Sequence, residues 1–134
     1  MTREVGIHWA AIAGSAVLCE FVLLALAAVL RPFGQQAVTI MAVTGSFVLP
    51  LLCALWVGSR SQSRFVVQGF LIGLVAMLIY LALLGAVRAF GPAEPAQPFA
   101  YEVAHALKLL GGIIGGVVAA RQAHRAPKMG SGVI

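Results

Sequence analysis

Four apolar stretches of about 20 residues each follow one another along this chain of 134 residues, and they constrain its fold more than any other feature. They lie at about residues 8–30, 37–57, 65–87 and 99–120. A helix needs roughly 20 apolar residues to cross the hydrocarbon core of a bilayer. Because 61% of the residues are hydrophobic and only 10% are charged, the chain lacks the polar surface of a soluble domain. The sequence therefore predicts an all-α polytopic membrane protein, a single domain built as a bundle of four transmembrane helices.

The basic residues predict one orientation of this bundle in the membrane. Lys and Arg collect on cytoplasmic loops, and with a cytoplasmic N-terminus six basic residues fall on the inner side and two on the outer side. The inner six are Arg3, Arg60, Arg64, Arg121, Arg125 and Lys128, and the outer two are Arg31 and Arg88. We therefore expect both termini in the cytoplasm and a basic tail, residues 121–134, that faces anionic lipid headgroups. The net charge of +5 then reflects topology, and we expect no nucleic-acid partner.

The first stretch has an alternative interpretation as a cleaved signal peptide. It is longer than the apolar region of such a peptide, and it carries Glu20 near its centre. We therefore interpret it as a membrane-spanning helix.

An internal repeat follows from these boundaries. The first and third stretches are each followed by a similar tetrapeptide, at 31–34 and 88–91. The second and fourth are each followed by two arginines four residues apart, at 60–64 and 121–125. The pattern predicts two copies of a helical hairpin related by an axis along the membrane normal. The alternative is a coincidence among apolar segments that end in Arg.

Two charges inside the apolar stretches form the main candidate site. Glu20 and Lys108 are each about 12 residues from the cytoplasmic end of their helix, so they share a depth. Both lie on faces of small residues, from which we expect the first and last helices to touch and the two charges to pair. The pair either fixes the helix register, or Glu20 carries a proton or cation.

Other polar residues extend this site along the last helix. Glu102 and His105 precede Lys108 at helical spacing and form a polar stripe, which could line a water-filled vestibule or contact a partner subunit. For His105 alone, a helix-contact histidine is the simpler interpretation.

Glycines at four-residue spacing predict close helix packing. They occur twice in the last stretch and once in the third, at Gly111, Gly112, Gly115 and Gly116, and at Gly69 and Gly73. Such spacings let helix backbones approach, but they do not identify the helix that is met. Packing within the chain and packing within an oligomer both remain open.

The sequence indicates neither a cofactor nor an enzyme. Cys19 and Cys53 are the only cysteines, and their expected depths differ by roughly 10 Å, too far for a disulfide. No metal site is expected from two thiols, and His8 and His124 lie too near the helix ends for a haem site with His105. No nucleophile-base set or phosphate-binding loop is present.

Two families show a resemblance. The four short spans, the basic turn leading into 68–73 and the glycine-rich run at 110–116 resemble the small YrzE-like bacterial membrane proteins, which implies a bacterial cytoplasmic membrane and no defined activity. The segment at 14–20 is similar to the first helix of small multidrug resistance exporters, which implies a dimer in which Glu20 binds protons and drug in turn. The second-helix signature of the exporters is missing, and Lys108 has no counterpart there.

The sequence therefore favours a non-enzymatic accessory or assembly subunit that packs against itself or against a larger membrane complex, because packing glycines outnumber chemically active groups. Membrane lipids are the other expected partner. The alternative is a small proton- or cation-coupled secondary transporter that uses Glu20.

Overall fold

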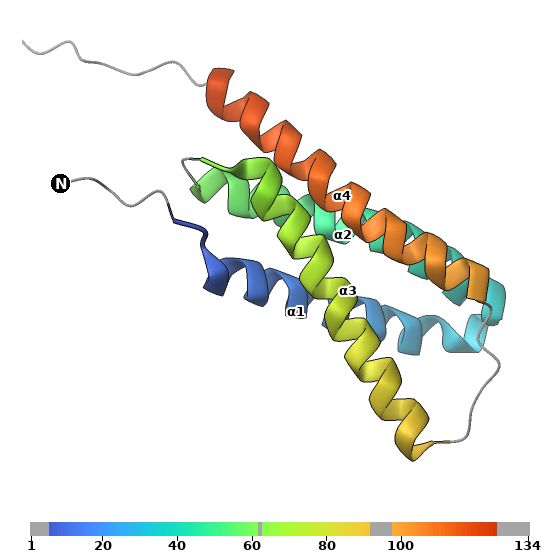
Figure 1. Ribbon diagram of the computed structural model, residues 1–134. Helices are drawn as coiled ribbons and strands as arrows, with labels where there is room; N and C mark the ends of the chain where they lie inside the picture. The colour runs from blue at the N-terminus through green and yellow to red at the C-terminus, as the bar shows by residue number, and fades with distance from the viewer. Residues whose placement is uncertain (1–5, 62, 92–97, 126–134) are drawn as a thin grey trace, which may run out of the picture.

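The computed structural model describes residues 6–61, 63–91 and 98–125, and in these ranges the secondary structure is entirely helical. Figure 1 shows the four α-helices and their order along the chain. They are α1 (Trp9–Leu30), α2 (Gln35–Arg60), α3 (Phe65–Phe90) and α4 (Pro98–Arg125), with a short 3-10 helix η1 (Arg31–Phe33) after α1. Each α-helix is long and apolar enough to cross a membrane, as predicted.

The helices α2, α3 and α4 continue past the ends expected from hydropathy. Helix α2 ends at Arg60 rather than at residue 57, and α4 continues to Arg125 rather than to residue 120. Polar and basic side chains are tolerated where a helix leaves the hydrocarbon region, so the helical backbone does not stop where apolar composition stops. At the end of α2, the Arg60 guanidinium lies over the Trp56 ring, 4.0 Å from its centroid.

The two described turns end the helices in different ways. After η1, Gly34 has a φ of +98°, a backbone conformation that residues with a side chain rarely adopt. Between α2 and α3, the buried Gln68 donates a 3.1 Å hydrogen bond from Nε2 to the Ser63 carbonyl, and its Oε1 lies 2.7 Å from the Ser61 hydroxyl. One buried amide therefore ties the start of α3 to the turn that precedes it.

Helices α2 and α3 separate α1 from α4. In Figure 1, α4 lies along α2 and α3, and α1 lies on their other side. Among the described residues, no Cα atom of α1 is within 8 Å of a Cα atom of α4. A pair of hairpins related by two-fold symmetry would place α1 against α4 as α2 lies against α3. The contacts within the bundle therefore do not follow the repeat in the sequence.

The described arginines of the helix ends fall into two groups at opposite ends of the bundle, as the sequence predicts. The start of α1, the turn between α2 and α3, and the end of α4 lie at one end of the bundle (Figure 1). Arg60, Arg64, Arg121 and Arg125 belong to these segments, whereas Arg31 and Arg88 belong to the opposite ends of the helices. Arg3, Lys128 and most of the basic tail lie outside the described residues.

Candidate functional site

The glycines of α4 form two faces that pack on different helices. A Cβ added to Gly112 or Gly116 would collide with the backbone of α3, at Gly69 and Phe65 respectively. A Cβ added to Gly111 or Gly115 would collide with the α2 backbone at Phe47 or Leu51. Because neighbouring residues on a helix differ by about 100° in direction, the doubled motif gives α4 two contact faces. The backbone of α4 therefore lies very close to both neighbours.

The glycines of α3 complete this contact and place a charged residue beside it. Gly69 meets Gly112, and a Cβ on Gly73 would collide with the carbonyl oxygen of Lys108. These glycines pack within the chain, which was one of the two alternatives that the spacing left open. The close approach holds the Lys108 backbone against α3, from where its side chain extends into the bundle.

Lys108 and Glu20 are brought together inside the bundle. The Lys108 ammonium donates to Glu20 Oε1, and the two residues are only 2% and 3% exposed. Removing both charges from water is costly unless they pair closely, and the direct hydrogen bond supplies that pairing. The contact joins α1 to α4 across the centre of the molecule.

The Lys108 side chain reaches Glu20 in a different way from the one expected. We expected the small-residue faces of the first and last helices to touch, but α1 and α4 are not adjacent. The glycines below Lys108 pack on α2 and α3 instead. The long aliphatic part of the Lys108 side chain spans the gap, so the expected pairing occurs without the expected helix contact.

Two aromatic rings of the bundle interior accompany the ion pair. The Lys108 ammonium lies 4.9 Å from the centroid of the Tyr80 ring, and the Tyr80 and His105 rings are 4.8 Å apart with an interplanar angle of 57°. The π face of Tyr80 therefore adds a second favourable contact to the buried ammonium. Among the described residues, the buried His105 Nδ1 has no hydrogen-bond partner.

The polar stripe on α4 is divided by its surroundings. Lys108 is buried, His105 is partly buried against Tyr80, and Glu102 is exposed. The predicted stripe therefore does not face one common environment. Its inner part belongs to the ion-pair cluster, and Glu102 lies outside that cluster.

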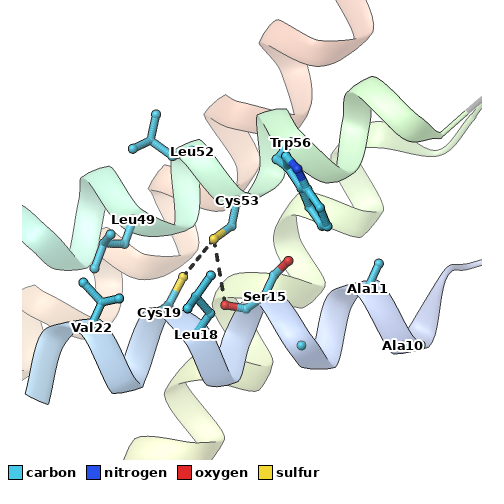
Figure 2. Close-up of a pocket in the computed structure, with 11 residues that line it drawn as sticks. Ala10, Ala11, Ser15, Leu18, Cys19, Val22, Leu49, Leu52, Cys53 and Trp56 are labelled. Atoms are coloured by element: carbon cyan, nitrogen blue, oxygen red, sulfur yellow. Dashed lines mark hydrogen bonds between the residues drawn. The ribbon is translucent and has the colours of Figure 1, made fainter. Parts of the chain in front are cut away.

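The expected separation of the two cysteines is wrong. Cys19 Sγ and Cys53 Sγ are 3.3 Å apart, and the Cys53 thiol also donates to the Ser15 carbonyl at 3.8 Å (Figure 2). The expected depth difference assumed parallel helices and an end of α2 at residue 57. Helix α2 continues to Arg60, so counting residues from an end at residue 57 misplaced Cys53. Both cysteines are free thiols.

These thiols lie on a groove between α1 and α2, which we call the thiol groove. It has a volume of about 590 Å³, and besides Cys19 and Cys53 it is lined by apolar side chains and small residues that include Gly14, Leu18, Val22, Leu49 and Trp56. A second apolar groove of similar volume lies between the other halves of the same helices, lined in part by Leu30, Ala37 and Ile40. Neither groove is lined by Glu20 or Lys108.

Several residues of these sites were not identified from the sequence. Tyr80 is one of three aromatic residues in the third apolar stretch, and nothing in its spacing relates it to Lys108. Gln68 lies near the start of the third apolar stretch, and a polar amide at that position is a signal for a buried hydrogen bond. The thiol pair was missed because its detection depends on where α2 ends.

Comparisons with models of known families, with curated proteins and with solved structures find no match to this chain. Its function is therefore inferred from the contacts described above.

Proposed function

We propose that this chain is a non-enzymatic assembly subunit of a bacterial cytoplasmic membrane, which it crosses four times with both termini in the cytoplasm. Its partner is a transmembrane helix of a second copy or of a larger membrane complex. The arginines at the ends of α2 and α4 support this orientation, because basic residues are retained on the cytoplasmic side. The apolar helices support the location.

The surroundings of the ion pair favour a structural role for its two charges. Glu20 and Lys108 are nearly inaccessible, and they neutralise each other. A carrier residue needs a path by which ions or substrate reach it, whereas the two grooves are lined by other residues. A pair that is closed inside the bundle supports helix register better than it supports transport.

The assembly proposal rests on the exposure of the outer half of α3, residues 81–90. Every residue from Leu81 to Phe90 except Leu84 is exposed, and a Cβ added to Gly85 would have no atom within 4 Å. Figure 1 shows this half of α3 diverging from the other helices. The inner half of the same helix is packed against α4 through Gly69 and Gly73. Within the described part of the chain, the outer half lacks such a neighbour.

The composition of this uncovered half fits a helix partner better than lipid alone. Ala82, Gly85, Ala86 and Ala89 are small residues on a lipid-exposed helix. Lipid chains gain no close contact from glycine, whereas small residues let a second helix approach until the backbones touch. We therefore place the partner on the outer half of α3.

Substitution of Gly85 tests this proposal. Because a Cβ at Gly85 meets nothing in the chain, Gly85→Leu should leave the fold intact while it keeps a partner helix at a distance. Native mass spectrometry after extraction in mild detergent should show the wild-type chain in an assembly, and at least about a ten-fold loss of that assembly in Gly85→Leu. The matched control is Ala13→Leu, an exposed small residue on α1, which should assemble normally.

Two results would contradict the assembly function. One is an unchanged assembly in Gly85→Leu. The other is a wild-type chain that is extracted alone and drives proton-coupled uptake in vesicles, with the uptake abolished by Glu20→Gln. The second result would establish the transporter alternative.

A further inference from the structure

We propose that Cys19 and Cys53 form an oxidisable dithiol site at the α1–α2 interface, and that the thiol groove admits its electron acceptor, a lipid-soluble quinone. This proposal is independent of the assembly function, since it concerns α1 and α2, whereas the proposed assembly surface lies on α3.

The separation of the two sulfur atoms is the first support. At 3.3 Å, the sulfurs are already in contact, and a disulfide requires a further approach of about 1.3 Å to reach its bond length. The Cys53 thiol donates to the Ser15 carbonyl, which leaves its sulfur free to accept the Cys19 S–H. The two sulfurs therefore face each other with no side chain between them (Figure 2).

The surroundings of the thiols determine which oxidant can reach them. Cys19 is 1% exposed, and the side chains of Leu18, Val22 and Leu49 line the same groove. Ionic oxidants do not partition into such apolar surroundings at membrane depth. An acceptor that dissolves in lipid can enter the groove from the side.

The size and shape of the thiol groove fit a small ring. Its volume of about 590 Å³ lies within the range of small-molecule sites, roughly 300 to 1,000 Å³. Gly14 and Ala11 leave space on the α1 side, and Trp56 on α2 offers an aromatic face. The groove therefore has space for the planar ring of the electron acceptor close to both sulfur atoms.

The reaction balances with the quinone as the only co-reactant. Each thiol loses one hydrogen, and a bond forms between Cys19 Sγ and Cys53 Sγ. The two electrons and two protons reduce the quinone to the corresponding quinol. The product ties α1 to α2 beside Glu20, and a thiol reductant reverses the step by thiol-disulfide exchange.

The test uses the full chain in lipid nanodiscs and tetramethyl-1,4-benzoquinone, whose substituted ring does not add thiols. The quinone should remove two hydrogen masses from the intact chain and protect both cysteines from N-ethylmaleimide, and dithiothreitol should restore both thiols. The matched control is Cys53→Ser combined with Leu49→Cys, which moves the second thiol one helical turn along the same groove. Its oxidation should be at least about ten-fold slower, because the sulfurs no longer meet.

A second pair of variants tests entry through the groove. Gly14→Leu adds a side chain in open space within the groove, so it should slow oxidation by the quinone without disturbing the fold. Ala13→Leu adds similar bulk outside the groove and should oxidise at the wild-type rate. Two reactive thiols after quinone treatment, equal rates for the original and shifted thiol pairs, or equal rates for Gly14→Leu and Ala13→Leu would each overturn the proposal.

Discussion

At the scale of single residues, the charges were easier to predict than their neighbours. An acid and a base within apolar stretches must be paired, so the sequence alone related Glu20 to Lys108. The aromatic contact of Tyr80 with Lys108 could not be predicted, because an isolated Tyr has no partner defined by spacing. The contact between the two thiols was excluded incorrectly, since a helix extension of a few ångströms decides whether two side chains meet.

Gly112 gives a prediction at this scale. A Cβ there would collide with the Gly69 carbonyl oxygen, and backbone cannot move aside as a flexible side chain does. We expect Gly112→Ala to lower the free energy of unfolding by about 1 to 3 kcal/mol, as overpacking does elsewhere. The measurement is unfolding in mixed micelles with increasing sodium dodecyl sulfate.

Gly14 provides the control for this substitution. It is also a helical glycine, but a Cβ added to it has no atom within 4 Å. Gly14→Ala should be neutral or slightly stabilising, because alanine favours the helix. Equal effects of the two substitutions would show that helix propensity, rather than close packing of α3 on α4, determines the result.

At the scale of helices, hydropathy predicted the existence of all four elements but not their neighbours. Four-residue glycine spacing identifies a packing face, yet any helix with a matching face can occupy it. The structure assigns one face of α4 to α2 and the other to α3. The order in which helices touch is a property of the whole packed bundle, and for this reason the expected contact between the first and last helices was wrong.

The two halves of α3 illustrate the same limit. Its inner half carries glycines that meet α4, and its outer half carries exposed small residues, among them Gly85, where an added Cβ would meet no atom within 4 Å. Both halves are apolar, so hydropathy does not distinguish packing within the chain from packing with a partner. The proposed assembly surface became visible only when the helix was placed in the bundle.

At the scale of the whole molecule, the distribution of basic residues leads to a prediction about topology. In the proposed topology of four crossings, the start of α1 and the end of α4 lie on the same side, together with the turn between α2 and α3. A fluorescent protein fused after Arg125 should fluoresce, because the proposed topology places this position in the cytoplasm. Alkaline phosphatase fused after Gly91 should be active, because the enzyme needs the oxidising outer side, where the proposed topology places Gly91.

The reciprocal fusions are the controls for this experiment. Alkaline phosphatase after Arg125 should be inactive, and the fluorescent protein after Gly91 should be dark. Equal activity of both reporters at one position would indicate dual insertion, in conflict with the bias of the basic residues.

We expect the buried Glu20–Lys108 pair to hold the bundle together by joining α1 to α4, two helices whose backbones are not adjacent. The most direct test is a double-mutant cycle with Glu20→Gln, Lys108→Met and the combined variant, followed by unfolding in sodium dodecyl sulfate. We expect Lys108→Met alone to cost about 3 to 5 kcal/mol, because it leaves a buried carboxylate without its partner, and the double variant to be more stable than Lys108→Met. Additive effects of the two substitutions on the free energy of unfolding would contradict this role of the ion pair.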